Sequence, residues 1–300
     1  MMSRVATNSG ARMMLGNLQT TGRSLMTAQE QATTGKRINR MSDNPADAVN
    51  ILGQKAVLRR LEQYARNSDE ASSWLSSGDA ALSSVNDRMA SARALLVQAN
   101  SAASDPTSRA AIAGQIRSLR DSLIQVANTQ RDGRPLFGGT AAVSAAYDSS
   151  GNYLGDNGAV SLPVAAGVTL QVNQSGTAVF GTHNNTDPTS GDVFQLLTSL
   201  ANSIEAGDTT AMGAGLGQID TATQRVALAQ VNIGSRSSQL EDLTNSLQDD
   251  QVRVKQGISA KEDIDLAETI VNLKTQEAAY QAALQATAKV IQPTLLDFLR

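Results

Sequence analysis

The sequence has 300 residues, of which 41% are hydrophobic but only 3% aromatic, and it holds no cysteine, one histidine and one tryptophan. A chain without cysteine has no disulfide framework and no cysteine-ligated metal site, and a single histidine excludes a histidine-rich metal site. The formal net charge of −3 provides no basic surface typical of nucleic-acid binding.

No segment approaches the roughly 20 consecutive apolar residues of a transmembrane helix. Residues 1–10 lack the apolar core of about 7–15 residues that a secretory signal peptide needs. These features fit a cytoplasmic protein, or one that is exported by a route that reads no cleaved signal.

The first predicted helix ends at Gly35, and Asn44-Pro45 starts the next, with asparagine as N-cap and proline at the first helical position. An apolar stripe along the first helix alternates spacings of four and three, but half of its members are small or polar. The stripe consists of Met14, Leu18, Thr21, Leu25, Ala28 and Ala32.

A second, long helix carries an apolar stripe from Ile51 to Ala103, and Asp105-Pro106 then repeats the pattern of a cap followed by proline. The third helix that follows should end near Asp132-Gly133. Its apolar face comprises Ile112, Ile116, Leu119, Leu123 and Val126.

Residues 134–192 are rich in glycine, serine, asparagine and aspartate, and predict a small β-rich domain. The segment Tyr147–Tyr153 resembles a hairpin turn, and apolar residues alternate over 160–164 and 168–172, as in strands. Pro163 favours an edge position for its strand.

Helix returns near Asp192, and a glycine-rich break at 207–217 precedes a long heptad helix. Its apolar residues fall at every seventh position, which favours a left-handed supercoil. They are Ile219, Val226, Ile233, Leu240, Leu247 and Val254. The second seam is polar, so this helix is expected to pack in a bundle with helices at 46–104 and 107–131.

Ser259-Ala260-Lys261-Glu262 has the pattern of a capping box and predicts the start of the last helix. The predicted fold is therefore mainly α: a long antiparallel helical bundle formed by the N- and C-terminal halves, with a small β-rich insertion in the middle. The expected division is 1–44 and 259–300 for terminal helical segments, 45–133 and 193–258 for the bundle core, and 134–192 for the β-rich domain.

The sequence holds no group of residues that predicts chemistry. His183 stands in a polar loop, and carboxylate pairs such as Asp249-Asp250 and Asp263/Asp265 fall on helix surfaces or helix starts. We therefore expect a protein that is not an enzyme, with no catalytic, cofactor-binding or metal site.

Residues 1–34 and 262–300 are rich in glutamine, threonine, alanine and asparagine, and each alone would be a marginal helix in water. Such segments can stay disordered in a monomer and fold against copies of themselves. The apolar positions expected to carry this assembly are Leu18, Leu25, Leu266, Ile270, Leu273, Leu284, Ile291, Leu295 and Leu299.

A Thr-Gly-basic stretch at 34–39 precedes a Ser-Asp-Asn-Pro turn and helix start at 42–48, a glycine-rich segment closes the third helix at 133–139, and the last helix carries further motifs at 263–268 and 276–283. These segments resemble the flagellin-like family of bacterial flagellar axial proteins. The apolar end at 295–299 is also similar. Pro45 follows the acidic turn as in the type 3 hook-associated proteins, whereas flagellins usually carry Asp-Asp-Ala there; Pro135 departs from the usual aromatic or aliphatic residue.

The resemblance covers residues 1–139 and 193–300, and it implies a structural role at the junction between hook and filament. In this family the terminal helices are disordered before assembly and form the inner tube, the bundle forms the next layer, and the middle domain faces outward. The implied partners are copies of the chain, a hook-side junction protein, flagellin and an export chaperone that binds the C-terminal helix, with no nucleic acid and no membrane insertion.

The resemblance also implies an extracellular place on the flagellum, reached through the flagellar secretion channel without a cleaved signal peptide. Flagellin itself is the nearest alternative. A secreted coiled-coil adhesin or effector is an alternative of another class.

Overall fold

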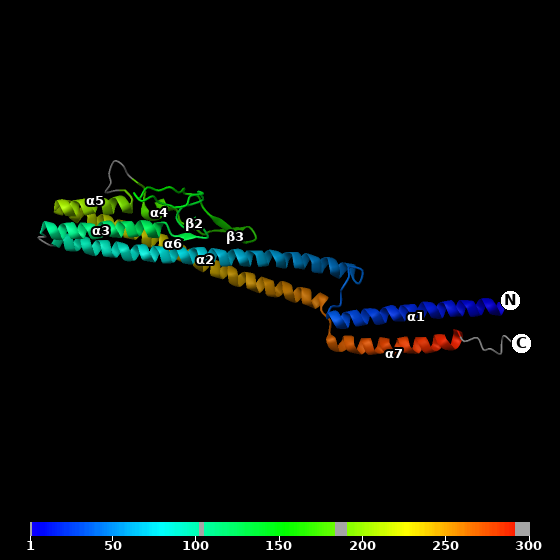
Figure 1. Ribbon diagram of the computed structural model, residues 1–300. Coiled ribbons are helices and arrows are strands. Elements are labelled where there is room, and N and C mark those ends of the chain that lie inside the picture. Colours follow the sequence, from blue (N-terminus) through cyan, green and yellow to red (C-terminus); the bar gives the residue numbers. More distant parts are fainter. Residues whose placement is uncertain (1, 102–104, 184–190, 292–300) are drawn as a thin grey trace. The chain divides into compact units, whose positions relative to one another are not determined.

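The computed structural model describes residues 2–101, 105–183 and 191–291 (Figure 1). Two compact units divide the chain, Met1–Arg60 with Asp250–Arg300 and Leu61–Asp249. The elements are α1 (Met2–Thr34), α2 (Pro45–Ser101), α3 (Pro106–Ala127), β1 (Gln130–Arg131), β2 (Arg134–Pro135), β3 (Ser161–Ala165), β4 (Val168–Gln171), α4 (Gly176–Phe180), α5 (Val193–Ala206), α6 (Thr209–Glu262) and α7 (Leu266–Ile291). Long helices with a few short strands confirm the predicted mainly-α fold.

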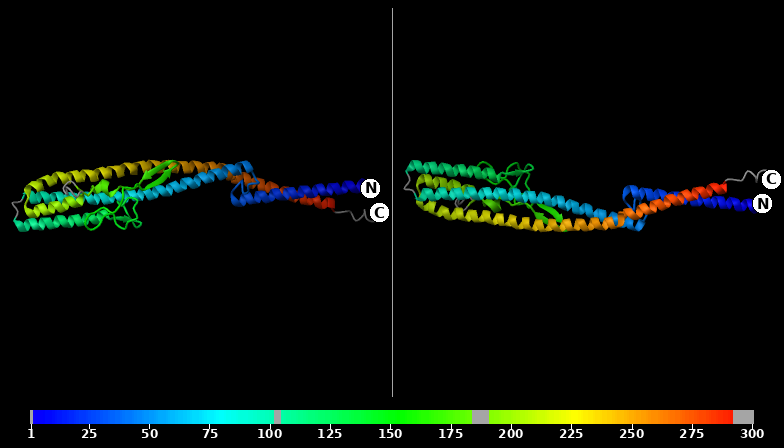
Figure 2. Two further views of the ribbon diagram at one scale, coloured as in Figure 1. Left: turned by 90° about the horizontal axis from the view of Figure 1, so that it is seen from above. Right: turned by 90° about the horizontal axis from the view of Figure 1, so that it is seen from below.

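In the unit Leu61–Asp249, the long helices α2 and α6 run antiparallel, as Figure 2 shows. Arg93 Nε of α2 donates to Asp220 Oδ1 of α6 over 2.8 Å. Nearer the N-terminus of α2, the Asn86 amide donates to Gln230 Oε1, further along α6, over 3.0 Å, as antiparallel helices require. Of the six predicted heptad residues of α6, five are buried and Val254 is half-buried; the buried ones are Ile219, Val226, Ile233, Leu240 and Leu247. Helix α5 packs along α3 and completes the bundle.

Five aromatic residues gather where the middle segment meets the bundle: Phe137, Tyr147, Tyr153, Phe180 and Phe194. The rings of Tyr147 and Phe194 lie 4.9 Å apart between centroids, and those of Phe137 and Phe180 lie 5.3 Å apart. Phe194 belongs to α5, so residues 134–192 share one hydrophobic core with the bundle helices. Both parts belong to the same compact unit.

The strands of the middle segment are short. β3 and β4 pair antiparallel with Leu162 opposite Leu170, and a single bridge joins Tyr147 and Tyr153. Asn67 of α2 donates to the Pro163 carbonyl over 2.7 Å, which ties the hairpin to the bundle. Helix α4 adds a turn of helix that the sequence pattern did not predict.

Two predicted helix ends were wrong. Helix α3 ends at Ala127 because the Asn128 side chain both donates to and accepts from the Tyr147 backbone, at 2.8 Å each way. Gly133, with φ +77°, instead turns the β1–β2 hairpin. The break predicted over 207–217 is only Gly207–Asp208 in the structure. Helix α6 already begins at Thr209, because the Asp208 side chain accepts from the Ala211 N–H.

The predicted capping box is also wrong. Helix α6 continues through Ser259 and ends at Glu262. The N-cap of the last helix is Asp265, whose carboxylate accepts from the backbone N–H of Ala267 at 2.9 Å and of Glu268 at 3.2 Å. The Glu262 side chain is not available for capping because two lysines bind it, as described below.

The other unit contains α1, α7 and the adjoining ends of α2 and α6. Helix α1 packs along α7 in an extended helix pair (Figure 1). Within the described part of the chain, none of the helices has an apolar stretch long enough to cross a bilayer.

Candidate assembly site

Small side chains take part in the contact between α1 and α7. Ala28 of α1 and Thr269 and Thr287 of α7 are buried. The Tyr280 ring lies over Gly22, where an added Cβ would stand 3.4 Å from the ring. Small residues let the two helices approach closely, but they bury little apolar surface.

Threonine can take part in this contact because its hydroxyl is satisfied within its own helix. The hydroxyl of Thr21 donates to the Asn17 carbonyl over 2.8 Å, and that of Thr287 donates to the Ala283 carbonyl over 2.7 Å. The methyl group is then free to pack. This explains how Thr21 serves in the apolar stripe predicted for α1.

The predicted assembly residues do not form one buried seam. Leu18, Leu25 and Leu273 are half-buried, whereas Leu266, Ile270 and Leu284 are exposed. Ile291 ends α7, but its side chain lies outside the described residues, as do Leu295 and Leu299. Their role in assembly stays a prediction.

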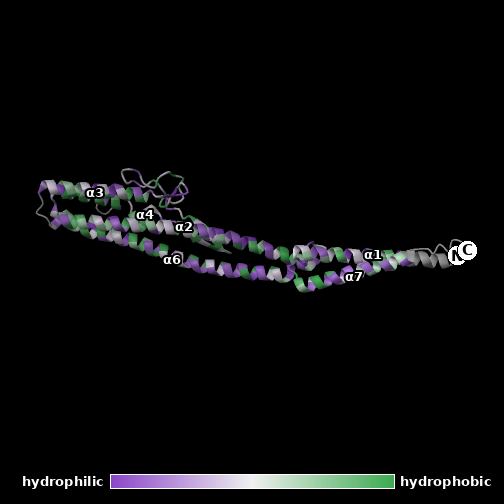
Figure 3. Ribbon diagram, turned by 60° about the horizontal axis from the view of Figure 1, so that its bottom comes forward, coloured by the Kyte–Doolittle hydropathy of each residue, from purple (hydrophilic) through white to green (hydrophobic). Residues whose placement is uncertain are grey.

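Further apolar side chains on the same unit are exposed, and the apolar positions predicted from the sequence do not include them. Met26 of α1 is 70% exposed and Val271 of α7 is 67% exposed. Figure 3 shows hydrophobic and hydrophilic positions interleaved along both helices. The signal was present in the sequence as apolar residues off the main stripe, but such residues are common on surfaces. Here they leave the helix pair with apolar surface that no other described residue covers.

Two linkers lie side by side: residues 35–44 connect α1 to α2, and residues 263–265 connect α6 to α7. We call them the linker pair. The Arg37 N–H donates to the Glu262 carbonyl over 2.6 Å, and the Ile264 N–H donates to the Gly35 carbonyl over 3.2 Å. Lys36 and Asp263 form a bridge between these bonds. Gly35 ends α1 with φ +70°, as predicted for a residue that stops a helix.

Glu262, the last residue of α6, is a buried charge beside the linker pair, with a side chain only 7% exposed. Lys36 Nζ lies 2.6 Å from Glu262 Oε1, and Lys55 Nζ lies 2.8 Å from Oε2. Burial alone would raise the pKa of Glu262, but the hydrogen bonds and charges of the two lysines outweigh it and lower that pKa. The same bond raises the pKa of Lys36. The linkers are thus held by charge as well as by backbone pairing.

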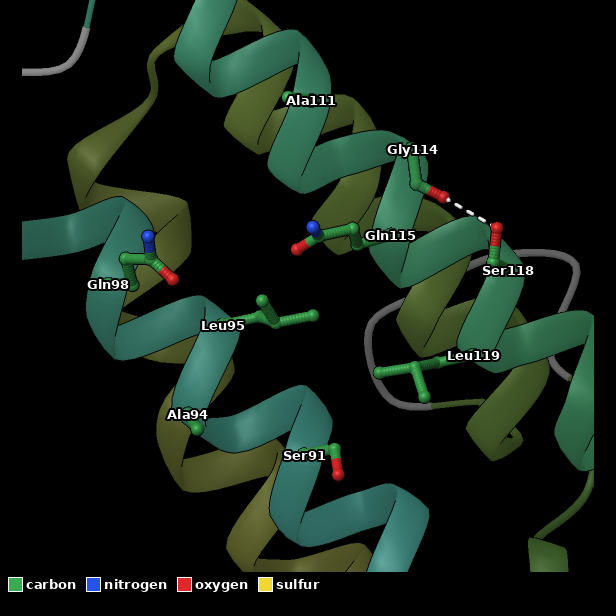
Figure 4. Close-up of a pocket in the computed structure, with 9 residues that line it drawn as sticks. All are labelled: Ser91, Ala94, Leu95, Gln98, Ala111, Gly114, Gln115, Ser118 and Leu119. Carbon is green, nitrogen blue, oxygen red and sulfur yellow. Dashed lines mark hydrogen bonds between the residues drawn. The ribbon is translucent and has the colours of Figure 1, made fainter.

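A groove of about 830 Å³ runs between α2 and α3 in the other unit (Figure 4). Leu95 and Leu119 point into it from the two helices, with Gln115 beside them, and the Ser118 hydroxyl donates to the Gly114 carbonyl over 3.1 Å. Every lining side chain is uncharged. The groove therefore offers surface for packing but no acid–base pair.

His183 has partners that its loop did not suggest. Its Nδ1 lies 3.0 Å from Asp192 Oδ2, and its Nε2 lies 2.9 Å from Gln195 Nε2. Asp192 also accepts from the Gln195 N–H over 2.8 Å as the N-cap of α5. His183 thus contacts the residue that caps the N-terminus of α5. Among the described residues, no three histidine, aspartate or glutamate side chains group as metal ligands would.

Comparison with known proteins matches both halves of the chain. Residues 5–142 match the bacterial flagellin N-terminal helical region, and residues 216–299 match the bacterial flagellin C-terminal helical region. The flagellar hook-associated protein 3 of Salmonella typhimurium is 26% identical over 278 residues, which is 85% of this chain and 86% of that protein. A flagellin of Bacillus subtilis is 24% identical over 310 residues, which is 99% of this chain and all of that protein.

A putative flagellar hook-associated protein from Vibrio parahaemolyticus has the same fold, with a TM-score of 0.67 at 22% identity over 74% of this chain and all of that one. The matched family regions include the linker pair and both of its flanking helix ends. With its N-terminal and C-terminal regions both matched, the chain belongs to the bacterial flagellin family of flagellar structural proteins.

Proposed function

We propose that this chain is a hook–filament junction protein, whose copies form a ring between a hook-side junction protein and the flagellin filament. The observation that carries the proposal is the similarity to a hook-associated protein 3 over most of both chains. Pro45 after the acidic turn supports the same subtype.

The ring is proposed to assemble through the terminal helices, with α1 and α7 in the inner tube, the bundle around them and residues 134–192 outermost. The exposed apolar side chains of α1 and α7 support this arrangement, since packing against copies would cover them. The residues proposed to carry the contacts are Leu18, Leu25, Leu266, Ile270, Leu273, Leu284, Ile291, Leu295 and Leu299.

Deletion of residues 1–34 or 266–300 should leave a folded bundle that no longer assembles. We further propose that both ends are disordered in the monomer. Circular dichroism and limited proteolysis of the purified chain test this point, and ends that are already helical and protected in the monomer would contradict it.

Flagellin is the second candidate, because this chain matches a flagellin of Bacillus subtilis along its whole length. Electron microscopy of the purified chain mixed with filament seeds separates the two functions. A junction protein should stop at short rings or fail to extend the seeds, whereas a flagellin should grow long filaments. An adhesin or effector would instead leave motility intact when the gene is deleted.

The chain is also proposed to leave the cell through the flagellar secretion channel, with its C-terminal helix bound by an export chaperone beforehand. Mass spectrometry of the protein from isolated flagella should find the N-terminal peptides retained. A chaperone should co-purify with the full chain but not with a chain that lacks residues 266–300.

A further inference from the structure

Two hollows flank the linker pair, and they carry opposite charge. The basic hollow, of about 360 Å³, is lined by Lys36, Arg40, Lys55 and Glu262, with Met41 and Leu52 at its apolar part. The acidic hollow, of about 370 Å³, is lined by Arg37, Asp263, Asp265 and Glu268, with Asn272 beside them. They have no lining residue in common.

The two hollows are separate, although neighbouring residues of the linkers line both. Consecutive residues alternate between them: Lys36 lines the basic hollow and Arg37 the acidic one, while Glu262 lines the basic hollow and Asp263 the acidic one. The Lys36–Asp263 bridge joins the two linkers between the hollows.

The charge excess of one hollow matches that of the other. Three cations face a single carboxylate in the basic hollow, because Lys36 and Lys55 share Glu262. Three carboxylates face a single guanidinium in the acidic hollow. Arg40, whose Glu30 partner lies 3.3 Å away, has a side chain that is 70% exposed, and Glu268 is exposed as well. Both charges can therefore reach a partner.

Each hollow also adjoins exposed apolar side chains. Met41, at 59% exposure, lines the basic hollow. Leu266, also at 59%, follows Asp265 of the acidic hollow in the chain, although it does not line that hollow. A surface with a charged centre and apolar neighbours fits a partner of the opposite charge with apolar residues of its own. The two hollows of this linker pair have such complementary compositions.

We propose that the acidic hollow of one copy of this chain docks against the basic hollow of the next copy. The two surfaces differ, so the contact is head-to-tail and repeats around a ring or a helical array. The inference deepens the proposed function. It rests on that function only for the expectation that the copies meet in the flagellum. It assigns the linker pair, rather than the terminal helices alone, to the contact between neighbours.

Because the chain has no cysteine, cysteine crosslinking can test the contact directly. Met41→Cys places a thiol at the basic hollow and Asn272→Cys one at the acidic hollow. In flagella isolated from cells that carry only the double variant, a short bismaleimide should give a ladder of multimers, while each single variant should stay monomeric.

Dimers formed by a single variant would overturn the head-to-tail arrangement. So would a double variant that is present in flagella but forms no ladder, or that crosslinks to a different flagellar protein instead. A chain absent from flagella would overturn the proposed function and not the docking. In that case the same crosslinking is carried out on the concentrated purified chain. A ladder from the double variant would support the docking, and its absence, or dimers of a single variant, would overturn it.

Charge reversal in the double-cysteine chain provides a second test. Arg40→Glu or Glu268→Arg alone should lower the multimer yield at least about tenfold, since each places like charges together. The two reversals combined should restore the yield, which a merely misfolded chain would not do. Lys255→Glu is the control, because it changes the net charge as Arg40→Glu does, on an exposed site of α6 outside both hollows. No recovery in the combined variant would overturn the proposal.

Discussion

Lys36 Nζ and Glu262 Oε1 lie 2.6 Å apart, although one residue follows the first helix and the other ends the sixth. Glu262→Gln keeps the shape of the side chain but removes the charge that holds Lys36 and Lys55. Both lysines remain partly exposed, so the loss should be moderate, about 1–2 kcal/mol of unfolding free energy. Urea unfolding followed by circular dichroism measures it.

The control for this substitution is Glu241→Gln, which changes the same atoms on an exposed part of α6. It should alter the free energy of unfolding by no more than about 0.5 kcal/mol. Equal effects of the two substitutions would mean that the linker pair is not held by Glu262.

The stability of the linker pair should depend on pH in a defined direction. The pKa of Glu262 is lowered in the folded chain, so its contribution is complete above the ordinary value of 4.5 and is lost as the pH falls through the lower folded value. The pKa of Lys36 is raised, so its contribution is present below 10.5 and is lost as the pH rises through the raised value.

The Glu262→Gln variant keeps every other carboxylate of this region, so its comparison with the wild-type chain isolates the contribution of Glu262. The urea midpoint of the wild-type chain should fall more steeply in acid than that of the variant. Parallel curves for the two chains would contradict the role given to Glu262.

Val271→Ser should weaken assembly without weakening the monomer. Val271 is 67% exposed on α7, so its replacement should change the unfolding free energy by about 0.5 kcal/mol or less. In the assembled protein it would leave a hydroxyl at a contact that we propose to be apolar. Recovery of the chain in isolated flagella, compared by immunoblot, measures the effect.

Val231→Ser is the matched control, because Val231 has the same side chain and the same 67% exposure on the part of α6 that lies in the other unit. It should enter flagella at the wild-type level. A loss as large as that of Val271→Ser would argue against a special role for the terminal helix pair.

Gly215→Ala and Gly213→Ala should have opposite effects on stability. A Cβ at Gly215 would overlap Leu200 Cδ2 and stand 3.3 Å from Leu96 Cδ2, and both leucines are buried. Such overpacking costs about 1–3 kcal/mol. A Cβ at Gly213 meets no atom within 4 Å, so alanine should stabilise the helix by up to about 1 kcal/mol. Thermal unfolding of the two variants checks the prediction, and a stabilised Gly215→Ala chain would contradict it.

The interior faces of the long helices were predictable because helical geometry alone sets them. Residues such as Ile219, Val226 and Ile233 recur at a helical period, and that period places them on one face before any partner is known. Asn44-Pro45 and Asp105-Pro106 likewise mark helix starts by local effects. Asn44 accepts from the Asp47 N–H, whereas the Asp105 side chain makes no capping bond and Pro106 alone favours the first helical position.

The site was less predictable, since its bonds join distant parts of the chain. Ser259 and Glu262 have the spacing of a capping box, but the lysines that bind Glu262 follow α1 and begin α2, so a local pattern could not reveal them. The half-buried state of Leu18 and the exposure of Leu266 depend in the same way on how α1 and α7 meet.

By itself, the sequence determined the long helices, their buried faces and the motifs of the flagellin family, because backbone geometry and local capping act over a few residues. Only the tertiary structure decided which charge Glu262 binds, which of two similar glycines is crowded, and where opposite charges collect around the linker pair. These features arise when segments far apart in the chain come together, and the spacing of these residues along the chain does not predict such contacts.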